Sequence, residues 1–380
     1  MKKNKLSTYI IDFDRVIFYC YLALCLIGVL VMVDITSVQS SMSYFYRHII
    51  FLGISFSAML VVLYFFNLEK LRFTNTILVY IAIAMLVWVL VKGATIKGAT
   101  RQLRLGPINF QPSFFARIAL IFFFANVLDK KNELLRATKN IFRLPLNFPA
   151  LSLLTVVTLG LIYAGKHLSA IIISGMTLLG ILFYAGIRKR IVFIIIILSL
   201  LAGVLILTQG DSFRMRRMTT FKKYSLFFPE RDLSYSDNAD YQVRESLTAL
   251  TSGGLWGTGM ARGRAKHYYL PEARTDYVYS IIGEEAGYFG AMLVIILHSI
   301  LFFASLKVAE RQESLYLKLL AAGMALNIYC NVLVNTGVAM SIIPSTGNTL
   351  PFISYGGSAL LMDSIAVGVI LNISARRRKV

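Results

Sequence analysis

The chain has 380 residues, of which 57% are hydrophobic and 15% are charged, and its mean hydropathy is +0.68. Soluble domains are about 45–50% apolar, so this composition excludes an ordinary soluble or disordered protein and indicates a polytopic membrane protein. The net charge is +20, and the three cysteines all fall inside apolar segments without a CxxC pair. They are typical of small buried side chains and predict neither a disulfide framework nor a metal site.

Apolar segments long enough to cross a membrane follow one another along the chain. A span needs roughly 17–25 mostly apolar residues. We predict spans near 16–33, 48–66, 75–91, 114–128, 148–164, 168–186, 191–209, 283–304, 317–341 and 355–373. The predicted fold class is therefore an all-α polytopic membrane protein of about ten transmembrane helices. It forms a single integral membrane domain, 1–380, with a large extracytoplasmic loop, 210–276, between the seventh and eighth helices.

The basic residues predict the orientation of the bundle. With both termini in the cytoplasm, the inner segments hold more than half of the 39 lysines and arginines. Most of these lie in short loops, where the positive-inside rule is most reliable, and a long loop such as 210–276 can cross regardless of its charge. We therefore expect a multi-pass protein of the bacterial cytoplasmic (inner) membrane with both termini cytoplasmic.

One outer loop, 92–107, breaks the charge rule, since it carries four basic residues and no acidic one. They are Lys92, Lys97, Arg101 and Arg104. Arginine suits bidentate phosphate recognition and lysine acts as a point charge, so an anionic headgroup is one candidate ligand. The alternative is a loop that only contacts solvent or lipid headgroups.

The long outer loop ends in a charged, proline-turned segment, LPEARTD (270–276), that runs directly into the eighth span. Asp276 should be partly desolvated there, which raises the pKa of a carboxyl group, while nearby Arg274 would lower it. An aspartate in that balance can act as a general base near neutral pH. The alternative is structural: Thr275 or Asp276 caps the helix. The residues alone do not separate these two interpretations.

Three further features carry open alternatives. The glycine run 252–259 predicts a tight turn whose backbone could approach a ligand, or an ordinary loop. We expect Glu284 or Glu285 to pair with a basic group from another span, such as Arg117. The uncharged loop 343–358 predicts a re-entrant turn that packs against the site, where its hydroxyl and amide groups bind a sugar or act as a rigid plug.

Several motifs in order resemble those of one family. LPEARTD followed by IGEEAG (282–287) resembles the LPEAHTDFIF and IGEELG signature of the SEDS proteins (shape, elongation, division and sporulation). LPFISYGGS (350–358) resembles that family's LPF(I/V)SYGGS. The segment 105–113, LGPINFQPS, and parts of 241–255 also align. The similarity covers most of the chain and agrees with the ten-span layout.

The resemblance implies a peptidoglycan glycosyltransferase that polymerises lipid II into β-1,4 glycan strands at the outer face of the membrane, for cell division or cell shape. The family's catalytic aspartate maps onto Asp276, as a general base. The implied partners are lipid II, undecaprenyl-diphosphate-linked glycan, membrane lipids and a class B penicillin-binding protein, and no nucleic acid. No cofactor is required by the sequence and no metal ligand is predicted, although a divalent cation, Mg²⁺ or Mn²⁺, can assist such chemistry. The candidate substrate-binding residues are Arg101, Lys97, Arg104, Gln111, Ser113, Gln242, Ser246, Glu272, Arg274, Thr275, Ser354, Tyr355 and Ser358. The candidate structural or ion-pair residues are Arg117, Glu284, Glu285 and Asp363.

Some positions depart from the family pattern. Where the family has QPSE followed by A-K, this chain has Phe114 in place of the glutamate and Arg117 in place of the lysine. We expect Arg117 to find another acid, such as Asp363 or Glu285. The family's histidine in LPEAHTD is Arg274, and the common QPDLGT reads GKHLSA (165–170). The segment 345–352 is more similar to the division and sporulation members, FtsW and SpoVE, than to the elongation member RodA.

Two other functions remain open from the sequence. A lipid II flippase would use polar residues inside spans, such as Arg117, Lys166 and Asp363, although no inverted repeat is detectable. A non-catalytic scaffold for a penicillin-binding protein is the other alternative. A scaffold should tolerate the substitution of Asp276, whereas a polymerase should not.

Overall fold

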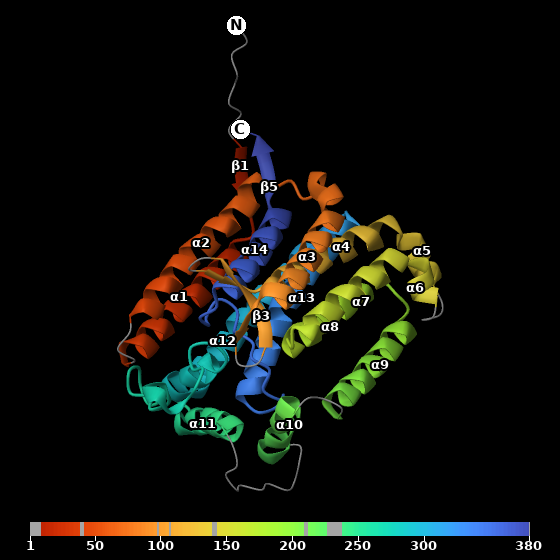
Figure 1. The fold of residues 1–380 in the computed structure, drawn as a ribbon. Coiled ribbons are helices and arrows are strands. Elements are labelled where there is room, and N and C mark those ends of the chain that lie inside the picture. The colour runs from red at the N-terminus through yellow and green to blue at the C-terminus, as the bar shows by residue number, and fades with distance from the viewer. Residues whose placement is uncertain are drawn as a thin grey trace.

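The computed structural model describes residues 9–38, 42–96, 99–105, 108–138, 143–208, 212–225 and 238–379. Helices make up most of this part of the chain (Figure 1). The helices are α1 (Arg15–Val38), α2 (Ser43–Phe65), α3 (Asn75–Lys92), α4 (Pro112–Lys130), α5 (Asn132–Ala137), α6 (Arg143–Asn147), α7 (Pro149–Ala164), α8 (Leu168–Tyr184), α9 (Lys189–Thr208), α10 (Ser212–Tyr224), α11 (Asn238–Ser252), α12 (Val278–Glu310), α13 (Leu315–Ala339) and α14 (Gly357–Ser374), with a 3₁₀ turn η1 (Lys70–Thr74) and a π-helical turn η2 (Ala265–Tyr269).

A helix lies at each of the ten predicted spans. Among the described residues, seven helices are long and apolar enough to cross a membrane: α1, α2, α3 with η1, α4, α12, α13 and α14. The apolar helices α7 and α8 are shorter. The predicted class, a mostly helical multi-pass membrane protein, is confirmed, whereas the count of ten spans stays a prediction.

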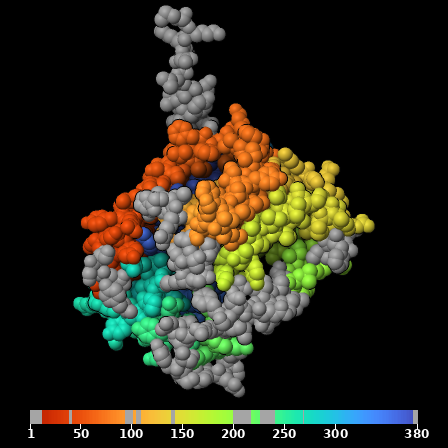
Figure 2. Space-filling model, in the orientation of Figure 1, coloured from red at the N-terminus to blue at the C-terminus, as the bar shows by residue number. Residues whose placement is uncertain are grey.

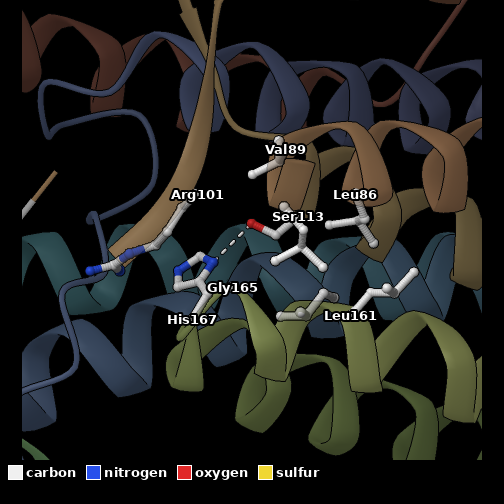
Figure 3. A pocket seen from close by; sticks show the side chains of 9 residues that line it. Leu86, Val89, Arg101, Ser113, Leu161, Gly165 and His167 are labelled. Carbon is white, nitrogen blue, oxygen red and sulfur yellow. Dashed lines mark hydrogen bonds between the residues drawn. The ribbon is translucent and has the colours of Figure 1, made fainter. Parts of the chain in front are cut away.

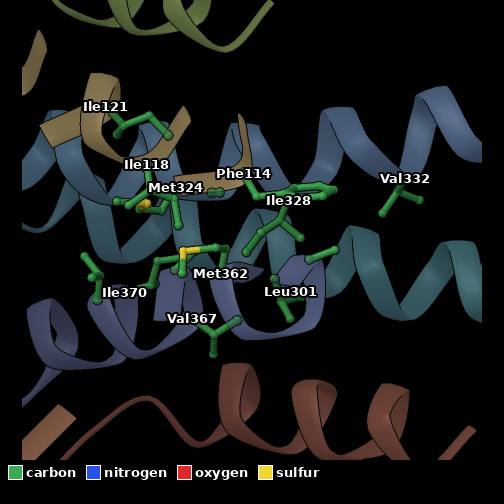
Figure 4. Packing of buried hydrophobic residues seen from close by; sticks show 14 of the residues in the cluster. Phe114, Ile118, Ile121, Leu301, Met324, Ile328, Val332, Met362, Val367 and Ile370 are labelled. Carbon is green, nitrogen blue, oxygen red and sulfur yellow. The ribbon is translucent and has the colours of Figure 1, made fainter. Parts of the chain in front are cut away.

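Three helices form the centre of the bundle. Within their most apolar windows, 78% of the residues of α4 and 72% of those of α13 and α14 are buried, against 28% for α2 and α12. Side chains of these helices interdigitate, as Phe114, Met324 and Met362 show (Figure 4). In lipid, where tails are as apolar as leucine, close packing of this kind holds helices together. Figure 2 shows the covering layer, behind which the blue α13 and α14 are almost hidden.

Short strands pair at one end of the bundle and in the loop between α3 and α4. β1 (Tyr9–Asp12) pairs antiparallel with β5 (Arg376–Lys379), so the described ends of the chain lie side by side, opposite α10 and α11 (Figure 1). β2 (Ala94–Ile96), β3 (Ala99–Leu105) and β4 (Ile108–Phe110) form a three-stranded antiparallel sheet. The prediction of an all-helical chain missed both sheets. The described residues of the basic loop between α3 and α4 pair their backbone groups in this sheet.

A kink in α12 explains the glycine run. Gly287 has φ 66° and ψ −166°, a conformation that only glycine adopts readily, and the helix is interrupted there. The loop 253–259 fills the break: the Thr258 amide donates to the Glu284 carbonyl at 2.9 Å and the Tyr288 amide donates to the Gly254 carbonyl at 2.9 Å. A Cβ on Gly257 would collide with the Glu285 backbone. These glycines thus allow close backbone-to-backbone packing against α12.

Candidate active site

Asp276 lies in the turn that precedes α12, at the end of the bundle remote from the termini. The amides of Asp276 and Tyr277 both donate to the Glu272 carbonyl, at 3.1 and 3.3 Å. Helix α12 begins at Val278, and its N-cap is Tyr277, without a side-chain capping bond. The structural alternative, in which Thr275 or Asp276 caps the helix, is therefore wrong.

The backbone of this turn is held at three successive carbonyls. The Tyr355 amide donates to the Arg274 carbonyl at 2.8 Å, and Ser354 Oγ donates to the Thr275 carbonyl at 2.6 Å. Asn335 Nδ2 of α13 donates to the Asp276 carbonyl at 2.9 Å. The loop between α13 and α14 thus folds inward and packs against the turn, as predicted. Ser354 is buried and serves this packing, which is a structural role in place of the predicted sugar contact.

Two arginines face the Asp276 carboxylate. Asp276 Oδ2 is 3.5 Å, and Arg101 Nη1 is 3.9 Å, from the position that a Cβ on Gly347 would occupy, so both groups meet at this glycine. Arg217, from α10, donates through Nη1 to the Ser345 carbonyl at 2.9 Å. Ser345 precedes Gly347 by two residues. The sequence interpretation did not single out Arg217, because nothing in a local motif places α10 beside the turn.

The charges and the burial of Asp276 act in opposite directions on its pKa. Its carboxylate is surrounded by protein, although the side chain keeps a partly exposed edge, and this desolvation together with the charge of Glu272 raises the pKa to about 6. A hydrogen bond from Thr275 and the positive charges of Arg217 and Arg101 limit the rise. The carboxylate is therefore ionised near pH 7 yet basic enough to accept a proton.

Arg274 does not play the role that the sequence suggested. Its guanidinium stacks on the Tyr44 ring of α2 at 3.9 Å, and Tyr44 in turn packs edge-on against Tyr355. The cations that act on Asp276 are Arg101 and Arg217 instead. Sequence proximity was a poor guide here because the turn points neighbouring side chains apart.

Beside Arg101 lies a pocket between α3, α4 and α7 (Figure 3). It is lined by Leu86, Val89, Leu90, Arg101, Ser113, Leu161, Ile162, Gly165 and His167. Ser113 Oγ is 2.8 Å, and Gln111 Nε2 is 2.9 Å, from His167 Nδ1. Burial and the charges of Arg101 and Arg117 lower the pKa of His167, which keeps the ring neutral. An apolar wall that ends at a cation suits an amphiphile with an anionic head.

The remaining predicted contacts divide into several groups. Ser246 is fully buried and bonds Ser280 Oγ at 2.6 Å and the Ala339 carbonyl at 2.8 Å, so it joins α11 to α12 and α13 and is not a substrate contact.

Ser358 Oγ accepts from the Gln111 amide and donates to the Asn109 carbonyl. Gln242, on α11, is partly exposed, and Glu272 is exposed and accepts a bond from Thr275 Oγ1 at 3.0 Å. Lys97 and the side chain of Arg104 lie outside the described residues.

The predicted partner of the α12 glutamates was wrong. Lys266 of η2 donates to Glu285 Oε1 and to Asp34 Oδ1 of α1, both at 2.6 Å, and is completely buried. Glu284 accepts from the amides of Arg264 and Ala265 at 2.8 and 3.0 Å. These carboxylates anchor η2, the segment just before the turn, because a buried charge must be paired or hydrogen-bonded.

Arg117 finds neutral partners. Its Nη1 donates to Asn331 Oδ1 at 2.9 Å, and its guanidinium lies 4.8 Å from the centre of the Phe114 ring. Asp363 acts on it electrostatically, but within the described residues no ion pair joins the two, and neither Asp363 oxygen has a hydrogen-bond partner. The predicted pair is thus a longer-range interaction inside the bundle.

The described residues contain no group of three or more His, Cys, Asp or Glu side chains that could hold a metal ion. A divalent cation would need most of its oxygen ligands from a substrate diphosphate and water, as Mg²⁺ commonly does.

Fold and site together define a multi-pass membrane protein with a carboxylate close to two arginines at one end of its bundle. A family model described as a cell cycle protein, of the FtsW, RodA and SpoVE group, matches residues 14–379. The chain belongs to this family.

Curated relatives and solved structures agree with this assignment. The chain is 32% identical to the probable peptidoglycan glycosyltransferase FtsW of Coxiella burnetii over 98% of both chains. It is also 32% identical to the stage V sporulation protein E of Bacillus subtilis over 87% of both. A chain from a peptidoglycan synthase complex that coordinates polymerization and crosslinking superposes with a TM-score of 0.76 at 23% identity, covering 96% of this chain and 98% of that one. The rod shape determining protein RodA of Thermus thermophilus superposes at 0.69 and 23% identity, covering 96% and 97%. At that identity the structures show the shared fold.

Proposed function

We propose that this protein is a peptidoglycan glycosyltransferase that polymerises lipid II, with Asp276 as its general base. The observation that carries the proposal is the placement of Asp276: a carboxylate of raised pKa, fixed at its backbone and facing Arg101 and Arg217. Relatives that match nearly the whole length of the chain bear the name of that activity.

The reaction needs a base for the attacking hydroxyl group and positive charge for the leaving diphosphate. The 4-hydroxyl of a GlcNAc attacks C1 of a MurNAc, and its proton passes to the Asp276 carboxylate as the new C1–O bond forms. The bond from C1 to the diphosphate oxygen breaks, and undecaprenyl diphosphate leaves with the electron pair. Arg101 and Arg217 are placed to stabilise that developing negative charge.

The proposal includes the location and the partner. The site faces the outer side of the cytoplasmic membrane, and both termini are cytoplasmic. A class B penicillin-binding protein docks along α12, α13 and the loop before them. In support, the outer end of α12 exposes large apolar side chains beside the loop 253–259, with Trp256 81% and Phe289 51% exposed. Among the relatives, the names FtsW and stage V sporulation protein E favour a division or sporulation role.

The test is glycan polymerisation from labelled lipid II by the purified protein with its penicillin-binding partner. Wild type should form polymer, and Asp276→Asn, which keeps the shape but removes the basic group, should lose activity by at least about 100-fold, within the range of general-base catalysis. Equal polymer from both would remove Asp276 from the mechanism. Absence of polymer from folded wild type, with lipid II crossing vesicles instead, would favour the flippase. The same assay with a chelator decides whether a divalent cation assists.

A further inference from the structure

A chain of buried amide side chains leads from the middle of the bundle to the Asp276 turn. Asn335 Nδ2 donates both to the Asp276 carbonyl at 2.9 Å and to the Asn348 carbonyl at 2.6 Å. Asn348 Nδ2 donates to Asn331 Oδ1 at 3.0 Å, the same oxygen that accepts from Arg117 at 2.9 Å. All of these side chains are at most 4% exposed.

Asn335 joins two segments that meet at the reacting groups. One of its bonds holds the residue that carries the base. The other holds Asn348, whose neighbour Gly347 lies close to both the Asp276 carboxylate and the Arg101 guanidinium. Gly347 has φ 72°, a left-handed conformation that glycine adopts without strain. The Asn335 amide group therefore holds both the turn that carries Asp276 and the loop at Asn348.

The far end of the network is fixed by charge. Arg117 is 2% exposed and sits in the most buried helix, α4, against the Phe114 ring. A buried guanidinium must find acceptors, and Asn331 supplies one. The amide oxygen of Asn331 thus lies between two donors, which fixes its orientation and, through Asn348, that of the loop.

We propose that Asn335, supported by Asn348, Asn331 and Arg117, is a positioning residue that holds Asp276 in its reactive geometry. This inference rests on the proposed function, since it assigns Asn335 a part in the same reaction. Misplacement of a reacting group by about 1 Å can cost on the order of 100-fold in rate. The network acts on the base and its surroundings and has no contact that would bind substrate.

The experiment compares Asn335→Leu with wild type in the lipid II polymerisation assay, with the partner present, and measures kcat, KM and the pH profile. We expect kcat to fall on the order of 100-fold, while KM for lipid II stays within about twofold. The acid limb of the profile should also move to lower pH, because a released turn gives the Asp276 carboxylate more water. Asn331→Leu should lower kcat less than Asn335→Leu, because Asn331 is farther along the network.

Asn327→Leu is the matched control, since Asn327 lies on the same helix, is 1% exposed and has a carbonyl oxygen without a hydrogen-bond partner. It should keep the wild-type kcat. Asn335→Gln, which keeps both donors on a longer chain, should restore the position of the acid limb and part of kcat. If Asn335→Leu fails to fold, Asn335→Gln still tests the positioning role through its kcat and pH profile.

Wild-type kcat and pH profile in Asn335→Leu, an equal loss in Asn327→Leu, or no recovery of the acid limb in Asn335→Gln would overturn the positioning role. Asp276→Asn, assayed in parallel, keeps the two proposals apart. An inactive Asp276→Asn beside a fully active Asn335→Leu removes only the positioning role. An active Asp276→Asn removes the base itself.

Discussion

At the scale of single residues, the charges around Asp276 predict how activity depends on pH. A general base must be deprotonated, and its pKa is raised to about 6. Polymerisation should therefore be lost as the pH falls through about 6 and should level off above it. Removing the negative charge of Glu272 in Glu272→Gln should move this limb to lower pH. Removing a positive charge in Arg217→Gln should move it to higher pH, since each change reverses a contribution to the pKa.

Arg274→Gln is the control for these shifts, because Arg274 stacks on Tyr44 and does not act on the carboxylate. Its limb should coincide with that of wild type. A profile that stays flat through pH 6 in wild type, or that moves equally in all three variants, would contradict the assignment of Asp276 as the titrating group.

The residues around Asp276 also show which parts of the candidate site can be predicted from the sequence. The sequence singles out Asp276 and Arg101 because each lies in a motif or an unusual run of charge. Arg217 and Asn335 were not found, since only tertiary contacts bring α10 and α13 to the turn. Arg274 was misjudged because two residues of separation in a turn do not imply facing side chains. Ser246 and Ser354, which the sequence offered as substrate contacts, are buried and hydrogen-bond to backbone carbonyls instead.

At the scale of elements, the buried Lys266 predicts how the turn is anchored. Lys266 bridges α1 and α12 through Asp34 and Glu285. Lys266→Met would leave two carboxylates buried without their cation, which costs about 3–5 kcal/mol for a broken buried pair. We expect a clear loss of thermal stability in detergent. The control is Lys222→Met, since Lys222 is exposed on α10.

The triple change Lys266→Met, Asp34→Asn and Glu285→Gln should recover much of the stability, because removing a whole buried charge cluster is far less costly than breaking it. If Lys266→Met were as stable as Lys222→Met, the bridge would not anchor η2. The sequence contained all three residues, but the 232 positions that separate Asp34 from Lys266 hid the cluster.

At the scale of the whole molecule, hydropathy predicts where the helices lie in the sequence but not which of them are central in the bundle. The spans come from long apolar runs that read the same whether a helix faces lipid or protein. The structure shows that α4, α13 and α14 are central, and their small and polar residues, such as Gly323 against Ile121, allow that close packing. The strand pairs escaped prediction because short polar segments carry no strong periodic signal.

The arrangement of the two ends of the bundle predicts a definite orientation. The strands β1 and β5 lie at one end and the Asp276 turn, α10 and α11 at the other (Figure 1). The charge rule assigns the first end to the cytoplasm. Because Cys20, Cys25 and Cys330 are buried, single cysteines can be added at exposed sites: Thr251 near the end of α11 and Lys70 in η1. A membrane-impermeant maleimide should label Thr251→Cys in intact cells and Lys70→Cys only after permeabilisation. The opposite pattern would put the site on the cytoplasmic side, where a polymerase that builds an external wall could not use it.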